Sequence, residues 1–264
     1  MKTGKALIAE INACKTDAFW WLGQQSFAVR LGGRVLYFDL FLAERPDRRI
    51  PPLLRPEEIV NADIVFGSHD HDDHIDRAVW KAVALASPNA VFVCPKPLLP
   101  SMEGVAPAGR IRGLDDGETV DLGGVRVTGV AAAHEFLDPD PATGRHPYLG
   151  YIAEAGGRRV YHAGDTCRYD GLAAKLRKPG ALAAMFLPIN GRDGTRYRSG
   201  CIGNMTFQEA ADLAGEVGPG IAVPAHFEMF ASNLGDPVAF GEYLEAKYPA
   251  VGLRIPTHGM RTDF

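Results

Sequence analysis

The chain has few cysteines, and they are not arranged in pairs. Its four cysteines, Cys14, Cys94, Cys167 and Cys201, form no Cys-x-x-Cys pair and lie far apart in the sequence. A disulfide framework or a structural zinc ribbon requires paired, regularly spaced cysteines, so this pattern argues against both. Reduced thiols in a cytoplasmic protein fit the spacing better.

Long apolar runs and an excess of positive charge are missing as well. The first apolar run, residues 6–9, ends at Glu10, which argues against a signal peptide, and no stretch approaches the length needed to cross a bilayer. The 32 acidic residues outnumber the 28 Lys and Arg, and the formal net charge of −4 argues against general affinity for nucleic acid. We therefore expect a cytoplasmic protein whose partners include neither a membrane nor a nucleic acid.

The chain does contain enough apolar sequence for a large core. It has 264 residues, of which 46% are hydrophobic, so it is long enough for one large domain or two small ones. Glycine and proline are spread evenly, and no linker or low-complexity stretch divides the sequence. We predict a single domain that spans residues 1–264.

Apolar periodicity and turn-forming residues divide the chain into two similar halves. The first half has a predicted helix after Asp76 and predicted strands at residues 19–22, 26–31, 34–40, 64–66 and 90–94. The second half has predicted helices at residues 172–176, 207–217 and 237–247, and predicted strands at 119–122, 125–131, 149–155, 158–162, 182–188, 221–223 and 253–255. Thr206 and Glu209 form a capping box at the start of the helix at 207–217. We predict an α/β (α+β) fold in which two mostly antiparallel sheets pack face to face as a four-layer helix–sheet–sheet–helix (αββα) sandwich.

One ten-residue stretch concentrates imidazoles and carboxylates. Residues 67–76 read GSHDHDDHID and hold three of the chain's eight histidines and four aspartates. The stretch lies between a predicted strand and a predicted helix, the usual place for ligands in layered α/β folds. A charged surface loop is the alternative, but imidazole and carboxylate are the usual ligands of Zn²⁺ and similar ions. The stretch therefore predicts a metal site.

The spacing of these donors favours two pairs of ligands. Residues two apart in an extended segment point the same way, so His69 and His71 face one point while Asp70 faces away. The chain then turns into the helix, which lets Asp73 and His74 approach from the other side. Two pairs of donors can hold two ions rather than one.

Three further potential ligands follow predicted strands in the second half. His134 follows VRVTGVAAA, Asp165 follows RRVYHAG, and His226 follows IAVPA. Each residue alone fits a hydrogen-bonded core or loop side chain equally well. In the company of the stretch at 67–76, they predict a metal centre that both halves complete.

Other polar residues near these motifs have no unique interpretation. Asp70 and Asp72 either orient the imidazoles through hydrogen bonds or are merely solvated, and the sequence favours neither. We interpret Cys167 as a small residue of a tight turn and His162 as a core or outer-sphere side chain. His146 belongs to no motif, and neither does His258.

These residues carry a resemblance to a known family. Residues 69–74, HDHDDH, match the His-x-His-x-Asp-His signature of the metallo-β-lactamase superfamily, and His134, Asp165 and His226 fall in the order and context of its later metal positions. The resemblance covers nearly the whole chain and implies a metallo-β-lactamase sandwich with metals between the ends of the two sheets. A narrower resemblance, to the L-ascorbate-6-phosphate lactonase branch, is carried by SHDHDDHID, YHAGDTCRYDGL and LPINGRD…GNMT…VPAHFEMF…DP.

The resemblance implies a role for each ligand. Two divalent ions would bind, either Zn²⁺ or Mn²⁺, with Fe²⁺ also compatible with the donors. Asp165 would bridge the ions, and Asp73 would also act as the catalytic base that takes a proton from a bridging hydroxide. The first ion would be held by His69, His71 and His134, and the second by Asp73, His74 and His226.

A long loop, residues 188–206, is the predicted region of substrate contact. Loops of this length inside compact domains are usually functional, and this one contains several arginines and ends at the start of a helix. Arginines and helix N-termini both favour anions. Together with the family resemblance, this makes Asn190, Arg192 and Asn204 the predicted contacts to a small anionic metabolite.

The resulting functional prediction is a metal-dependent lactonase that opens a (phosphorylated) sugar lactone, and the family leads us to expect a homo-oligomer. The main alternative is a phosphodiesterase that acts on a nucleotide, nucleic acid or phospholipid with the same two-metal site. The acidic balance argues against nucleic acid, and the lack of an amphipathic membrane-facing stretch argues against phospholipid. A non-catalytic metal-binding protein is less favoured, because the full ligand set includes Asp73 as a base.

Overall fold

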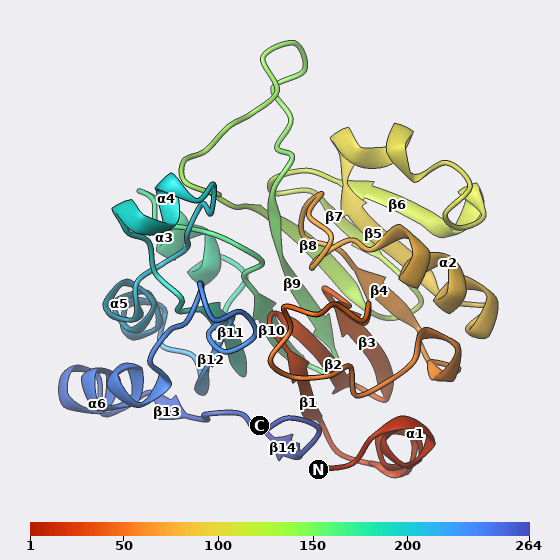
Figure 1. Cartoon of the computed structure of the whole chain (residues 1–264), viewed down its shortest axis with the longest axis horizontal. Helices are drawn as coiled ribbons and strands as arrows, with labels where there is room; N and C mark the ends of the chain where they lie inside the picture. The colour runs from red at the N-terminus through yellow and green to blue at the C-terminus, as the bar shows by residue number, and fades with distance from the viewer.

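Two seven-stranded sheets form the centre of the computed structural model, which describes residues 1–264 (Figure 1). The first sheet contains, in spatial order, β14 (Arg261–Asp263), β1 (Ala18–Gly23), β2 (Ser26–Leu31), β3 (Arg34–Phe38), β4 (Ile64–Phe66), β5 (Val91–Pro95) and β6 (Ile111–Leu114). The second contains β13 (Gly252–Leu253), β12 (Ile221–Ala225), β11 (Ala184–Pro188), β10 (Arg158–His162), β9 (Leu149–Ala155), β8 (Arg126–Ala131) and β7 (Thr119–Asp121).

Both sheets are mixed, and the prediction of mostly antiparallel sheets is wrong. In the first sheet β14, β1, β2 and β3 pair antiparallel, whereas β3, β4, β5 and β6 pair parallel. The second sheet repeats this division, with β7 to β10 antiparallel and β10 to β13 parallel. Tight hairpins join antiparallel neighbours, but a connection that crosses over through a helix returns the chain in the parallel direction.

Helices cover the outer face of each sheet. On the first sheet lie α1 (Gly4–Ala13) and α2 (Arg77–Ala86), whose apolar residues share one core cluster with Trp20 and Tyr37. On the second lie α3 (Leu172–Arg177), α5 (Phe207–Val217) and α6 (Pro237–Lys247). The predicted four-layer αββα sandwich of two similar halves is thereby confirmed. None of the helices is both long enough and apolar enough to span a membrane.

Alternation along the strands builds the core between the two sheets. In β1, Phe19 and Trp21 pack with residues of the second sheet, whereas Trp20 packs with α1 and α2. The reason is that successive strand residues point to opposite faces. The ring of Phe19 lies 5.1 Å from that of Phe186 on β11, which joins the two sheets edge to face. The inner core thus holds the two halves in one fixed relation.

Several elements differ from the prediction in ways that affect the centre. The strand predicted at 34–40 ends at Phe38, because Asp39 adopts a left-handed backbone with a φ of 44°. The loop predicted at 188–206 contains a short helix, α4 (Gly194–Arg198), capped by Asp193. The capping box of Thr206 and Glu209 is present as predicted. The helix α1 and the edge strands β6 and β14 were not predicted, and short 3₁₀ helices occur at Pro56–Glu58, Lys96–Met102 and Ala108–Arg110.

Candidate metal centre

The predicted ligands all follow the carboxyl ends of strands. The ligand-rich stretch begins directly after β4, and His226 comes directly after β12. His134 lies a few residues after β8, and Asp165 a few residues after β10. Because these strand ends meet along one edge of the sandwich, side chains distant in sequence reach the same point.

A tight turn brings the donors of the ligand-rich stretch together. The backbone oxygen of His71 accepts hydrogen bonds from the backbone nitrogens of His74, at 2.9 Å, and Ile75, at 2.8 Å. The turn returns His74 to within 4.1 Å of His69, measured between ring centroids. Asp76 then caps α2 by accepting from two backbone nitrogens. At Gly67 a Cβ would lie 2.2 Å from Ile75, so only glycine permits this close packing.

All seven predicted ligands converge in three overlapping groups. Within each group the candidate ligand atoms lie within 4.8 Å of one another. One group shares His69 with the second group and His74 with the third, so the three form one continuous centre. The groups are His69, His71 and His134; His69, His74 and Asp165; and Asp73, His74 and His226.

Distances between donor atoms describe the two sides of this centre. On one side, His71 Nδ1 lies 2.8 Å from His69 Nε2 and 3.4 Å from His134 Nε2. On the other side, Asp165 Oδ1 lies 3.4 Å from His74 Nε2 and 3.2 Å from His226 Nε2. Asp165 also shares a ligand group with His69, so it lies between the two sides of the centre.

The donors fit bound divalent ions. His74 Nε2 and Asp165 Oδ1 are buried, and apart from the close approach of other potential ligands at 3.2–3.4 Å neither atom has a hydrogen-bond partner. Burying a polar atom without a hydrogen bond is costly. Both atoms point into the centre, where an ion would satisfy them. The donor set of five imidazoles and two carboxylates is the chemistry that Zn²⁺, Mn²⁺ and Fe²⁺ share.

Burial and neighbouring charges set the protonation states of the donors, and they act in opposite directions on different histidines. Burial lowers the pKa of His134 to about 4 and holds the pKa of His69 well below its usual value, so both rings are neutral. Although burial opposes charge, nearby carboxylates, Asp165 foremost, raise the pKa of His74 to about 10. The pKa of Asp165 is well below its usual value despite burial, because His226 and His74 favour its charged form. A bound ion would displace the proton of His74.

A buried aspartate that no sequence motif indicated orients two of the ligands. Asp39 is fully buried, and its carboxylate lies 2.7 Å from His74 Nδ1. The same carboxylate accepts hydrogen bonds from the backbone nitrogen of Ser68 at 2.8 Å and from the Ser68 hydroxyl at 2.7 Å. That hydroxyl is also 2.9 Å from His69 Nδ1. The orienting role left open for Asp70 and Asp72 therefore falls to Asp39: Asp70 pairs with Arg77 at the surface, and Asp72 is exposed.

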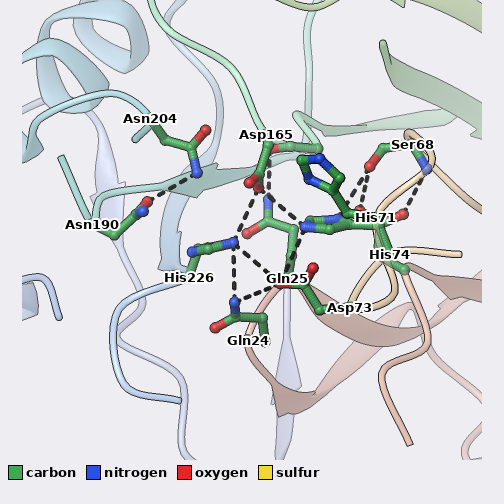
Figure 2. A network of polar contacts seen from close by, with 12 residues as sticks. Gln24, Gln25, Ser68, His71, Asp73, His74, Asp165, Asn190, Asn204 and His226 are labelled. Atoms are coloured by element: carbon green, nitrogen blue, oxygen red, sulfur yellow. Dashed lines mark hydrogen bonds and ion pairs between the residues drawn. The ribbon is translucent and has the colours of Figure 1, made fainter. Parts of the chain in front are cut away.

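The turn between β1 and β2 also enters the centre, although no motif in the sequence indicated this. Gln24 has a left-handed backbone with a φ of 52° and is buried. Its side-chain nitrogen donates to Asp73 Oδ2 at 2.9 Å and lies 3.1 Å from His226 Nε2 (Figure 2). The neighbouring Gln25 donates to the backbone oxygen of Gly164 at 3.2 Å. The only sequence signal was a short turn between two strands, which does not reveal what the turn contacts.

A cavity of about 430 Å³ opens onto the centre. Five of the predicted ligands line it, together with Gln24, and the opposite wall comes from three loops. The wall residues are Arg45, Asp47, Gly200, Cys201, Ile202, Phe230, Ser232 and Asn233. Only three of the fourteen lining residues are hydrophobic, so the cavity suits a polar molecule of small-metabolite size.

The three predicted substrate contacts do not line this cavity. Asn190 and Asn204 are buried and hydrogen-bond to each other, with Asn204 donating to Asn190 at 3.1 Å (Figure 2). Arg192 pairs with both carboxylate oxygens of Glu209 at 2.7 Å and donates to the backbone oxygen of Asn204. In this geometry all three support the wall of the cavity, and their contact with substrate stays a prediction.

Four other residues have structural partners. His162 is buried and stacks on Phe38, with ring centroids 4.8 Å apart. Cys167 is buried in the turn after Asp165, as interpreted from the sequence. His146 lies 3.0 Å from Asp115, and His258 stacks on Trp21 and lies 3.0 Å from Glu228.

Comparison with known proteins agrees with this fold. Residues 35–227 match the family model for the beta-lactamase superfamily domain. The chain belongs to this superfamily. A UPF0173 metal-dependent hydrolase of Archaeoglobus fulgidus is 31% identical over 249 residues, which cover 92% of this chain and 97% of the relative. Another, from Methanopyrus kandleri, is 27% identical over 230 residues, which cover 85% and 90% of the two chains.

A solved structure extends the comparison to three dimensions. Igni18, a metallo hydrolase from the archaeon Ignicoccus hospitalis, aligns with a TM-score of 0.73 and 21% identity, covering 94% of this chain and 98% of that one. This alignment supports the predicted metallo-β-lactamase fold. The family model and the two relatives confirm the prediction of a metal-dependent hydrolase. The narrower resemblance to the lactonase branch stays a prediction.

Proposed function

We propose that this metal-dependent hydrolase opens the lactone ring of a small, polar, anionic metabolite with the help of two divalent ions. The observation that supports this most directly is the position of Asp73. Its carboxylate belongs to the ligand group with His74 and His226, yet its side chain is 22% exposed and lines the cavity. A carboxylate so placed can exchange a proton with a molecule in the cavity.

Two ions rather than one are proposed because the ligands form two sets. His71 and His134 lie on one side of the centre, Asp73 and His226 lie on the other, and Asp165 stands between the sets. Ions held at both places would supply a water-derived nucleophile near neutral pH and polarise a carbonyl oxygen. The donor set suits Zn²⁺ and Mn²⁺ equally, and it also accepts Fe²⁺.

The chain's own residues would handle the proton. Opening a lactone adds water across the bond between the acyl carbon and the ring oxygen, so the carbon gains a hydroxyl group and the ring oxygen leaves with a proton. Asp73 would accept the proton from water and return it to the leaving oxygen. Gln24 holds Asp73 Oδ2 by a hydrogen bond of 2.9 Å, which fixes the carboxylate at the base of the cavity.

The proposal is tested with protein loaded with Mn²⁺ and, separately, with Zn²⁺. Acid release is followed with L-ascorbate 6-phosphate, with L-ascorbate, and with the phosphodiester bis-p-nitrophenyl phosphate. We expect turnover of the phosphorylated lactone and a loss of about 10²- to 10⁴-fold in Asp73→Asn, the range typical of a general base. Asp72→Asn is the matched control, because Asp72 is exposed and belongs to no ligand group.

The outcomes separate the alternatives. Turnover of the phosphodiester alone would reject the lactonase and favour the phosphodiesterase with the same centre. Full activity of Asp73→Asn would reject Asp73 as the base. Two ions bound per chain without turnover of any of the three compounds would reject this substrate class and leave a metal-binding protein.

A further inference from the structure

The wall of the cavity opposite the histidines contains its only lysine or arginine. Arg45 lies in the loop between β3 and β4, and it lines the cavity with two aspartates of the centre, Asp73 and Asp165. Its one partner of opposite charge is Asp47, which accepts from Arg45 Nε at 3.0 Å and from Nη2 at 2.9 Å. The guanidinium carbon lies 5.7 Å from the centre of the Phe230 ring, which also lines the cavity.

The ion pair between Arg45 and Asp47 can break at little cost in stability. Their side chains are 43% and 51% exposed, and ion pairs this exposed contribute little stability. Asp47 foremost, with smaller contributions from Asp73 and Asp72, raises the pKa of Arg45, so the guanidinium is always charged. Breaking the pair to bind another anion therefore costs little, and Phe230 supports the guanidinium while it exchanges partners.

A chain of three asparagine amides orients a second donor on the same wall. Asn204 donates to Asn190 at 3.1 Å, and Asn190 donates to Asn233 Oδ1 at 2.8 Å. Because Asn233 lines the cavity and its oxygen is already engaged, its side-chain nitrogen is left to donate to a molecule there. Arg196 stabilises this arrangement by donating to the backbone oxygens of Asn190 and Leu234.

We propose that Arg45 and Asn233 form an anion-recognition wall that binds a phosphate or carboxylate group carried by the substrate at the end remote from the reacting carbonyl. This inference rests on the proposed function, since it names the part of the substrate that the centre does not touch. Arg45 supplies the charge, Asn233 supplies an oriented hydrogen bond, and Asp47 occupies Arg45 until the anion arrives. Arg192, by contrast, is committed to Glu209 and lies outside the cavity.

The wall can be tested by equilibrium binding, without turnover. Isothermal titration of the Mn²⁺-loaded protein compares 6-phosphogluconate with gluconate. The two probes share a carboxylate and hydroxyl groups that can approach the ions, so the ratio of their affinities reports the phosphate alone. We expect a ratio of about ten to one hundred in the wild type, the value of a hydrogen bond to a charged group.

Variants in one loop distinguish contact from general charge. Arg45→Gln should reduce the ratio to about three or less, whereas Asp47→Asn should increase it, because the competing carboxylate is gone. Arg49→Gln is the matched control: Arg49 lies in the same loop and is exposed, but it does not line the cavity. Thermal unfolding checks that each variant is folded, and Asp47→Asn keeps the test valid should Arg45→Gln unfold.

Each outcome decides the proposal. The proposal is supported if the affinity ratio of 6-phosphogluconate to gluconate falls to about three or less in Arg45→Gln and is unchanged in Arg49→Gln. Equal losses in both variants would show a long-range effect of charge and overturn it, as would a wild type that binds the two probes equally. A phosphate preference that survives in Arg45→Gln would mean that the phosphate reaches the ions instead. Failure of lactone turnover with an intact phosphate preference would reject the proposed reaction but not the wall.

Discussion

The two halves of the molecule share one strand order but contribute ligands in opposite ways. In each half, an antiparallel group of strands is followed by three parallel strands. β4 and β11 hold corresponding places, each pairing in parallel with the last strand of its antiparallel group. The loop after β4 supplies four potential ligands, whereas the loop after β11 supplies none. The second half contributes single residues after three different strands instead: His134, Asp165 and His226.

This difference shows how the centre is assembled. The first half places four donors through one local turn, so their geometry depends mainly on residues 67–76 and on the carboxylate of Asp39. The second half places its three donors through the alignment of separate strands, which depends on the packing of the whole sheet. We therefore expect the two halves to respond differently to mutation.

The largest expected effect comes from removing one imidazole from each half. His71→Ala and His226→Ala should each weaken metal binding by more than about a hundredfold, since loss of an outer-sphere partner alone costs 10- to 100-fold. The measurement is metal content per chain after dialysis against a chelator of known affinity. His146→Ala is the control, because His146 pairs with Asp115 and belongs to no ligand group. Full metal content in His226→Ala would contradict the contribution of the second half.

A smaller effect is expected from the residue behind the local turn. Asp39→Asn should weaken metal binding by about 10- to 100-fold, because the amide cannot accept from both Ser68 and His74 as the carboxylate does. Competition with a chelating dye measures the affinity, and thermal unfolding of the metal-free protein measures stability separately. Asp63→Asn is the control, since Asp63 accepts from Arg34 and Val35 away from the centre. Equal weakening in both variants would show that only general stability was lost.

The smallest effects are expected at the caps of two corresponding helices. Asp76→Ala at α2 and Thr206→Ala at α5 should each cost about 1 kcal/mol, which lowers the melting temperature by about 2–4 °C. Only Asp76→Ala should also weaken metal binding, because α2 begins directly after the ligand-rich turn. Thermal unfolding without metal and titration with Mn²⁺ measure the two effects. Unchanged affinity in Asp76→Ala would show that the turn holds its shape without the helix.

Local sequence was sufficient for several elements whose structure a few neighbouring residues determine. The capping box at Thr206 and the strand at residues 149–155 were predicted at their observed positions, since hydrogen bonding and alternation act within a few residues. The ligand-rich stretch was also predicted from the sequence, because its donors are close together along the chain. The mixed character of the sheets was missed, since strand direction depends on which strands become neighbours.

The sequence by itself determined the kinds of ligand, their order along the chain, the two-half pattern and, through its signature, the superfamily. Only the tertiary structure decided which further side chains surround them. Gln24 contacts His226, Asp39 contacts His74, and Arg45 lines the cavity, and each of these arrangements joins distant parts of the chain. No periodicity or spacing encodes such contacts, because they arise only when the two sheets pack and bring their strand ends to one edge.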